Sequence, residues 1–151
     1  MSDLRELYQE MILDHAKSPR NRRAIEEESQ QAEGFNPLCG DRLSVFVRLE
    51  GDRLADASFL GTGCAICMAS ASLMTERVRG KTRAEVDDLF TRFHDLVTGK
   101  TASEASTEDM GKLQVLAGVR DFPVRVKCAT LAWHALRAAL HQDTETISTE
   151  S

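Results

Sequence analysis

The sequence predicts an α+β fold in which an antiparallel hairpin packs against helices. Apolar and polar residues alternate over 43–49, and a second strand-like run occupies 53–60. Glu50-Gly51-Asp52 supplies a turn between these runs, which makes the two strands antiparallel neighbours. Over 65–78 the apolar residues change to helical spacing, so helices are expected to cover the sheet.

Before the hairpin, the chain is expected to open with an amphipathic helix. Its apolar residues follow helical spacing from Leu4 to Ile12, and Pro19 bounds the segment. The polar and highly charged stretch 20–33 is interpreted as a solvated loop, with an edge strand near 32–35.

After the hairpin, start and stop signals mark the remaining helices. Gly80 ends the helix over 65–78. Thr82 and Glu85 form a capping box that opens the next helix. Pro123 has a backbone angle that suits the first turn of a helix, and the last helix is expected to begin there.

The length of 151 residues is close to that of one ordinary domain and is sufficient for a real core. We therefore expect a single domain over 1–151. Within it, 98–112 is a polar segment rich in small residues, interpreted as an exposed insertion with a short helix at 106–110. The segment 143–151 is expected to be a frayed tail.

Composition argues against several classes of partner. The formal net charge of -5 provides no basic field to attract nucleic acid or anionic lipid. No apolar run is long enough to cross a membrane, and the N-terminus lacks the basic and apolar regions of a signal peptide. These features predict a cytoplasmic protein, where cysteines stay reduced and are used for metal binding or chemistry more often than for disulfides.

A turn before the hairpin combines a thiol with a carboxylate. Cys39 and Asp41 flank Gly40, and Pro37 restrains the approach to them. Glycine permits the backbone to turn so that both side chains face one point. A thiolate with a carboxylate suits zinc or iron, whereas calcium and magnesium prefer oxygen ligands alone. The segment therefore predicts a metal and sulfur site.

Two further cysteines are candidates for the same site. Cys64 lies at a strand-to-helix junction, and Cys128 lies in the first turns of the last helix. The partial positive charge at a helix N-terminus lowers the pKa of a nearby thiol, which favours both as ligands. The alternative is that they are buried free cysteines that pack as small apolar side chains. Because Cys128 shares an apolar face with Leu131 and Ala135, that alternative stays open.

Two other residues are interpreted as structural. Cys67, three residues after Cys64, could be a spare ligand or a resolving thiol, but its helix is rich in apolar residues and packing is favoured. A thioredoxin-like redox role would need a βαβ setting that the hairpin pattern does not supply. His15 falls on the apolar spacing of the first helix and is expected to be a core or helix-face histidine rather than a ligand.

Several stretches of the chain form linked motifs. They are Leu7-Tyr8 through Asp14-His15 with Pro19-Arg20-Asn21, Asn36-Pro37-Leu38-Cys39-Gly40-Asp41, Gly61-Thr62-Gly63-Cys64-Ala65-Ile66 with Ala69-Ser70-Ala71-Ser72, and Val126-Lys127-Cys128-Ala129-Thr130-Leu131-Ala132-Trp133. Together they resemble the U-type iron-sulfur cluster assembly proteins, specifically the SufU branch, over nearly the whole chain. The IscU branch typically has His where Lys127 stands, and the insertion 98–112 also resembles SufU. Cys67 departs from the family, which more often has a small or polar residue there.

The resemblance implies a three-stranded antiparallel sheet packed with helices, and a zinc site. Its ligands would be Cys39, Asp41, Cys64 and Cys128. In family members the cysteine that matches Cys39 accepts persulfide sulfur from a pyridoxal-phosphate-dependent cysteine desulfurase, which here would be SufS-like, with a SufBCD-like scaffold downstream. Bound zinc would keep the sulfur deprotonated and unreactive until a partner loosens the coordination.

Two other functions stay open beside this zinc-dependent sulfurtransferase. One is a non-catalytic scaffold on which an iron-sulfur cluster is assembled and then transferred. The other is a purely structural zinc domain, which leaves a reactive thiol in an exposed turn without a purpose. Lys127 and the insertion favour the sulfurtransferase.

Basic residues before the last cysteine are the remaining candidates. The resemblance suggests that Arg125 contacts the desulfurase, since a guanidinium presents a rigid fork to a carboxylate. Lys127 either raises the thiolate character of Cys128 or points into solvent.

Overall fold

The computed structural model describes residues 2–25, 30–36, 40–98, 113, 115–116, 119, 122–141 and 147–148. In chain order its elements are α1 (Ser2–Lys17), β1 (Gln30–Asn36), β2 (Asp41–Glu50), β3 (Arg53–Thr62), α2 (Ala65–Val78), α3 (Arg83–Thr98), α4 (Pro123–Leu140) and β4 (Ile147–Ser148). The predicted α+β class is confirmed.

The sheet has the strand order β3-β2-β1-β4. β2 pairs antiparallel with both neighbours, so that Val45 lies opposite Phe59 on one side and Ala32 on the other. These strands form the three-stranded antiparallel sheet that the sequence predicted. β1 is longer than the strand expected near 32–35. Its polar residues alternate with the buried ones that face the helices, so the strand pattern extends over 30–36.

β4 was not predicted. It consists of Ile147–Ser148 and pairs parallel with β1 beside Gly34 and Phe35. These two residues therefore depart from the frayed tail expected at the C-terminus. An unpaired edge of β1 offers backbone donors and acceptors that a returning chain can satisfy, and sequence periodicity over two residues cannot reveal such a pairing.

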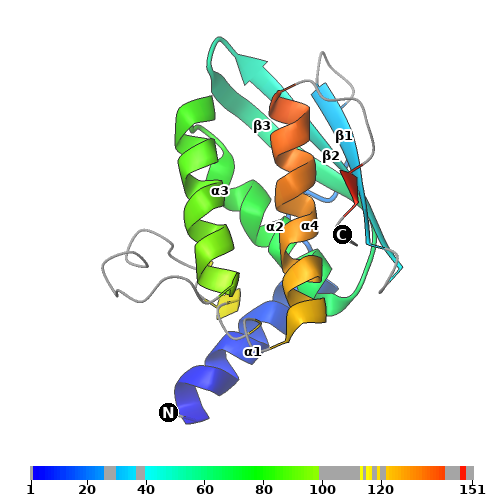
Figure 1. The fold of residues 1–151 in the computed structure, drawn as a ribbon, viewed down its shortest axis with the longest axis vertical. Helices are drawn as coiled ribbons and strands as arrows, with labels where there is room; N and C mark the ends of the chain where they lie inside the picture. The colour runs from blue at the N-terminus through cyan, green and yellow to red at the C-terminus, as the bar shows by residue number, and fades with distance from the viewer. Residues whose placement is uncertain are drawn as a thin grey trace.

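The helices all lie on one side of the sheet (Figure 1). α2 and α4 pack on the strands, α3 packs against α4, and α1 packs against α2. The core between these layers is apolar, and Trp133 of α4 stacks on Phe93 of α3 with ring centroids 4.6 Å apart. None of the helices within the described part of the chain is both long enough and apolar enough to span a bilayer.

The predicted helix boundaries are confirmed after the hairpin. α2 ends at Val78, just before Gly80, which adopts a positive φ of 84°. The capping box is formed in both directions, because Thr82 N–H donates to Glu85 Oε1 at 3.0 Å and Glu85 N–H donates to Thr82 Oγ1 at 3.2 Å. α4 begins at Pro123 as expected. Apart from its first residue, Thr98, the insertion and its short helix lie outside the described residues.

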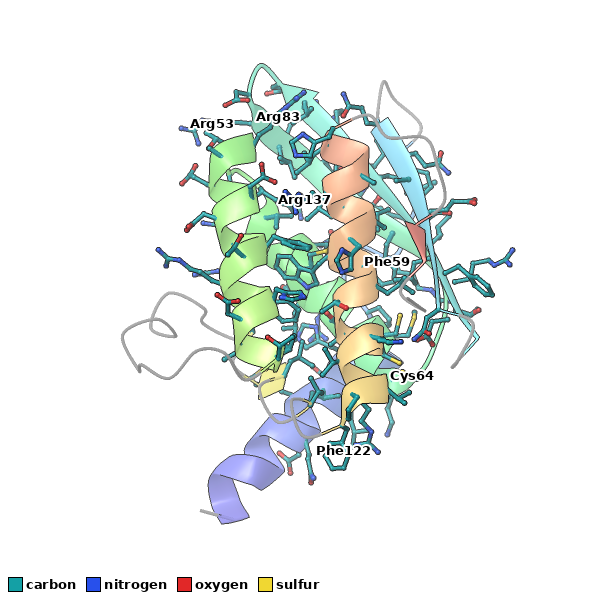
Figure 2. The ribbon with its side chains drawn as sticks, in the orientation of Figure 1. Arg53, Phe59, Cys64, Arg83, Phe122 and Arg137 are labelled. Atoms are coloured by element: carbon teal, nitrogen blue, oxygen red, sulfur yellow. The ribbon has the colours of Figure 1, made fainter. Side chains whose placement is uncertain are left out.

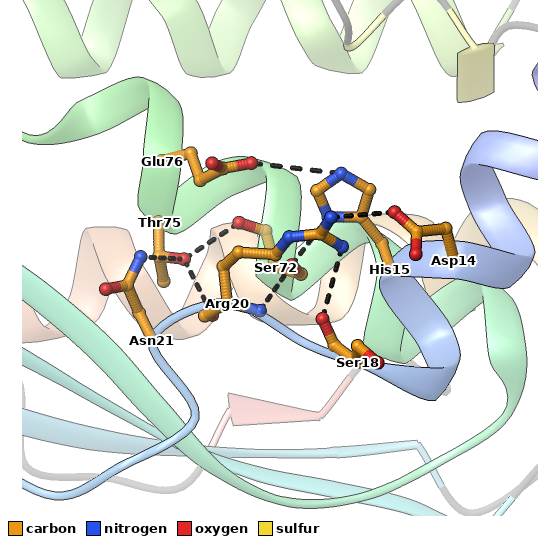
Figure 3. Close-up of polar contacts among 8 residues, drawn as sticks. All are labelled: Asp14, His15, Ser18, Arg20, Asn21, Ser72, Thr75 and Glu76. Carbon is orange, nitrogen blue, oxygen red and sulfur yellow. Dashed lines mark hydrogen bonds and ion pairs between the residues drawn. The ribbon is translucent and has the colours of Figure 1, made fainter.

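A polar network joins the end of α1 to α2 (Figure 3). His15 is only 2 % exposed, and its Nδ1 lies 2.7 Å from Ser72 Oγ. The backbone N–H of Arg20 donates to the same Ser72 oxygen at 2.8 Å. His15 Nε2 lies 3.8 Å from Glu76 Oε1. The prediction of a core histidine is thus confirmed, and Ser72 ties both α1 and the turn after it to the helix that starts beside Cys64.

Candidate metal centre

Side chains from three separate elements meet at one end of the sheet. Asp41 is the first residue of β2, Cys64 is the N-cap of α2, and Cys128 lies in the second turn of α4. The three ligand atoms lie within 4.8 Å of one another. Within the described residues, no other group of three histidine, cysteine or acidic side chains comes this close.

The three candidate ligands differ in their exposure. Asp41 and Cys128 are fully buried, whereas Cys64 is partly exposed. Figure 2 shows Cys64 near the N-terminal end of α4, with Phe122 at the very start of that helix. Cys39, the fourth ligand predicted from the sequence, lies outside the described residues in the connection between β1 and β2.

Backbone and side-chain donors hold the Asp41 carboxylate. The N–H of Cys64 donates to Asp41 Oδ1 at 2.8 Å. The side-chain amide nitrogen of Asn36 lies 3.5 Å from Asp41 Oδ2. Gly63 leaves the room for this arrangement, because a Cβ atom there would lie 2.9 Å from Asp41 Oδ1 and 3.0 Å from Cys67 Sγ.

The surroundings of Cys64 favour its thiolate. The Cys128 side chain hydrogen-bonds to it and is the main reason that the pKa of Cys64 falls to about 6 from an ordinary value of 9.0. The backbone N–H groups of Cys67 and Ile66 at the start of α2 act in the same direction, whereas burial and the Asp41 carboxylate oppose the shift. The helix N-terminus therefore helps Cys64, as the sequence suggested.

Cys67 packs in the interior. It is fully buried, belongs to the apolar core, and is not part of the three-residue donor group. The packing role predicted from its helix is the one that the structure supports. Its backbone N–H donates to Cys64 Sγ at 3.4 Å.

The basic residues before Cys128 have different surroundings. Arg125 is exposed, and its guanidinium carbon lies 4.9 Å from the centre of the Phe122 ring. Phe122 and Val124 are 51 % and 48 % exposed. Lys127 is half-buried. Arg125 therefore lies in an exposed, partly apolar patch at the start of α4, close in sequence to Cys128.

Sequence reasoning missed Asn36 as a residue of the site. It is fully buried, and its amide nitrogen lies 3.5 Å from Cys128 Sγ as well as 3.5 Å from Asp41 Oδ2. The available signal was its position at the head of the segment that carries Cys39 and Asp41. A strand pattern does not reveal which side chain at the end of a strand will face a helix from elsewhere in the chain.

The donor set fits a thiophilic metal ion. Two sulfurs and one carboxylate oxygen suit zinc or iron and do not suit calcium or magnesium. Three ligands from the described residues leave one position of a tetrahedral ion for a further group. Cys39 is separated from Asp41 by Gly40 alone, so it is a natural candidate for that position.

Comparison with known proteins establishes the family. The chain matches the NifU-like N terminal domain over residues 7–129, and it belongs to this family. It is 39% identical over 142 residues to a protein of Bacillus subtilis (strain 168) named zinc-dependent sulfurtransferase SufU, covering 94% of this chain and 95% of that one. It is 38% identical over 140 residues to the iron-sulfur cluster assembly scaffold protein IscU of Streptococcus pyogenes serotype M1, covering 93% and 86% of the two chains.

Solved structures agree with this assignment. A protein from Fervidobacterium islandicum AW-1, named for iron-sulfur cluster assembly in the SUF system, is 34% identical and superimposes with a TM-score of 0.80. The match covers 87% of this chain and 94% of that one. The family resemblance read from the motifs is therefore confirmed, and the fold is that of the SufU and IscU proteins.

Proposed function

We propose that this protein is a zinc-dependent sulfurtransferase that accepts persulfide sulfur from a cysteine desulfurase for iron-sulfur cluster assembly. The observation that carries the proposal is the group of Asp41, Cys64 and Cys128 within 4.8 Å, found in a chain 39% identical to SufU of Bacillus subtilis. Zinc would be held by these residues together with Cys39. When bound, it would stabilise the thiolate form of its cysteine ligands and moderate their reactivity.

Cys39 is the proposed sulfur acceptor. Its thiolate attacks the outer sulfur of the persulfide on the partner enzyme, the sulfur–sulfur bond of the partner breaks, and the cysteine of the partner leaves as a thiolate. Cys39 then carries the persulfide, and no external oxidant or reductant is needed. Only Gly40 separates Cys39 from Asp41 in the chain, so covalent geometry keeps their Cα atoms within about 7 Å.

The remaining ligands have different roles in the proposal. Cys128 is fully buried and Cys64 caps a helix, so both would stay in place while Cys39 reacts. Asp41 is held through both carboxylate oxygens by Cys64 N–H and the Asn36 amide. A carboxylate is a harder ligand than a thiolate and suits zinc less well, so it would make the site easier to open than a site with sulfur ligands alone.

The partner in this proposal is a SufS-like, pyridoxal-phosphate-dependent cysteine desulfurase, acting in the cytoplasm, with a SufBCD-like scaffold as the downstream acceptor. The exposed patch of Phe122, Val124 and Arg125 is the surface we assign to the desulfurase. It combines apolar area with a guanidinium that can pair with a carboxylate on the partner. Cys128 follows this patch directly on the same helix, so docking there would bring the partner to the metal centre.

The acceptor can be tested by replacing single thiols. Cys39→Ser should abolish stimulation of a cysteine desulfurase, because the serine hydroxyl cannot accept the sulfur. Cys67→Ser is the matched control and should retain nearly full stimulation, since Cys67 packs in the core. After reaction with desulfurase and cysteine, peptide mass analysis should place the added sulfur on Cys39. Sulfur found mainly on Cys67, or full stimulation by Cys39→Ser, would contradict the proposal.

A scaffold for cluster assembly is the second candidate, and the IscU of Streptococcus pyogenes favours it, because that scaffold is 38% identical to this chain. The two functions differ in what the purified protein should contain. Protein isolated without added metal should carry one zinc per chain if it is the sulfurtransferase. A coloured iron-sulfur cluster in that preparation would instead support the scaffold.

A further inference from the structure

We propose that Asn36 is a positioning residue, which holds Asp41 and Cys128 in place for metal binding. The inference rests on the metal centre of the proposed function. Asn36 is not itself a ligand, and the property that it controls is the affinity of the centre for the metal ion.

The position of Asn36 follows from the strand pairing. It is the last residue of β1 and lies directly opposite Asp41, the first residue of β2. The side chain is fully buried. Its Nδ2 atom lies 3.5 Å from Asp41 Oδ2 and 3.5 Å from Cys128 Sγ, so one amide group bridges ligands from β2 and α4.

The chemistry of the neighbours determines which end of the amide faces them. An ionised carboxylate can only accept hydrogen bonds, and a thiolate also accepts them. The amide nitrogen carries two N–H groups, one for each neighbour, whereas the amide oxygen would face two acceptors if the group were reversed. Asn36 therefore acts as a double donor toward Asp41 and Cys128.

A neutral donor suits this place better than a charged one. Asp41 and Cys128 are fully buried with their ligand atoms within 4.8 Å of each other, so a charged side chain between them would itself lose its solvation by water. The Asn36 amide nitrogen contacts both ligand atoms without adding charge. A lysine here would repel a metal cation, and an aspartate would add a further anion and remove the donors.

The amide also completes the restraint on the Asp41 carboxylate. Cys64 N–H holds Oδ1 at 2.8 Å, and Asn36 holds Oδ2 at 3.5 Å. With a donor on each oxygen, the carboxylate is kept from rotating away from the two sulfurs. Residues that hydrogen-bond to ligands in this way typically change metal affinity by about 10- to 100-fold when they are replaced.

The test compares two replacements of Asn36 with one replacement outside the centre. Asn36→Leu removes the donors and keeps the branched shape and the number of heavy atoms, and Asn36→Asp keeps the shape but cannot donate when ionised. Ser70→Ala is the control, since Ser70 is also fully buried and its hydrogen bonds join α2 to α4 through Ala129 O and Trp133 Nε1. Zinc affinity is measured by competition with a chromophoric chelator, and the ligand field by visible absorption of the cobalt(II) form.

We expect Asn36→Leu to bind zinc about 10- to 100-fold more weakly than the parent. Both Asn36 variants should shift the cobalt(II) absorption bands, whereas Ser70→Ala should keep the parent affinity and spectrum even if it melts earlier. If Asn36→Leu does not fold, the cobalt(II) spectrum of Asn36→Asp tests the inference.

Parent-like affinity and spectra in the Asn36 variants would overturn the inference, as would equal losses in Ser70→Ala, which would reveal a general loosening of the fold. A parent protein that binds neither ion would instead defeat the metal centre of the proposed function, and the role of Asn36 with it.

Discussion

The groups around the Cys64 thiol shift its pKa in opposite directions. It caps α2, accepts the N–H of Cys67 at 3.4 Å, and hydrogen-bonds to Cys128, while the Asp41 carboxylate and burial act against its negative charge. The stabilising contacts prevail, and the pKa of Cys64 falls to about 6. At neutral pH the metal-free site therefore already holds a thiolate, which removes one proton-release step from metal binding.

The first prediction follows from this thiolate. In metal-free protein, alkylation of Cys64 should be half-maximal near pH 6, whereas an ordinary thiol titrates at 9.0. Because the folded pKa is lower than the unfolded one, the thiolate should stabilise the fold fully above about pH 9, progressively less from pH 9 down to 6, and not at all below that range. The pH profile of iodoacetamide labelling at Cys64, read by peptide mass, measures the midpoint. Cys128→Ala, which removes the hydrogen-bond donor, should move the midpoint upward, and an unchanged midpoint would exclude Cys128 as the main cause.

The second prediction concerns Gly63, which contributes no ligand. Its backbone φ is not in the left-handed region, so an alanine there meets only a steric obstacle. The added Cβ would lie 2.9 Å from Asp41 Oδ1 and must displace the carboxylate or Cys67. Gly63→Ala should weaken zinc binding by about 10-fold, a loss typical of disturbed ligand support. Thr62→Ala, at the exposed neighbouring position, should bind like the parent, and a parent-like affinity for Gly63→Ala would show that the site can adjust.

At the scale of elements, α2 connects two parts of the molecule that the sequence keeps apart. Its N-terminus carries Cys64, and its middle carries Ser72, which holds His15 and the backbone of Arg20. Arg20 NH2 also pairs with Asp14 at 2.7 Å, so the end of α1 and the following turn are held together (Figure 3). The first of the linked motifs thus serves to dock α1 on α2.

The third prediction tests this docking. Ser72→Ala removes the oxygen that both His15 Nδ1 and Arg20 N–H use. Leaving a buried polar group without its hydrogen-bond partner lowers the free energy of unfolding by about 1–3 kcal/mol. Urea unfolding should show a loss of this size, and amide hydrogen exchange in α1 should become faster. Thr91→Ala, on the exposed surface of α3, serves as the control and should change stability by less than about 0.5 kcal/mol. Unchanged exchange in α1 would mean that apolar packing alone docks this helix.

At the scale of the whole molecule, the metal centre joins the layers of the fold. Asp41 comes from the sheet, Cys64 from the start of α2, and Cys128 from α4. An ion bound by all three adds a direct link between elements that apolar packing and a few hydrogen bonds already hold together. Binding free energy at such a site is therefore also folding free energy.

The fourth prediction follows from this linkage. Zinc at a free concentration 100 times its Kd should stabilise the fold by about 2.7 kcal/mol, and chelation should lower the melting temperature accordingly. We also expect one cooperative transition with and without metal, since 1–151 is predicted to be a single domain. Calorimetry of the chelated and zinc-loaded protein measures both. A melting temperature that does not depend on zinc would show that metal binding is not linked to folding. Two separate transitions would contradict the prediction of a single domain.

Local patterns were sufficient for most elements of the fold. Period-two alternation identified β2, the turn after it and a second strand-like run identified β3, the Thr82–Glu85 box identified the start of α3, and Pro123 identified the start of α4. These signals depend on interactions between residues close in sequence, which is why they can be read without a structure. β4 could not be predicted, because its pairing with β1 depends on where a distant segment returns.

The amino-acid sequence by itself determined which donor types are available, thiols at Cys39, Cys64 and Cys128 and a carboxylate at Asp41, and the family resemblance of their motifs predicted that they form one site. Only the tertiary structure decided that Asp41, Cys64 and Cys128 converge, that Cys67 is left in the core, and that Asn36 bridges two of the donors. The physical reason is that residue type sets what an atom can bind, whereas convergence depends on β2, α2 and α4 packing around a shared core.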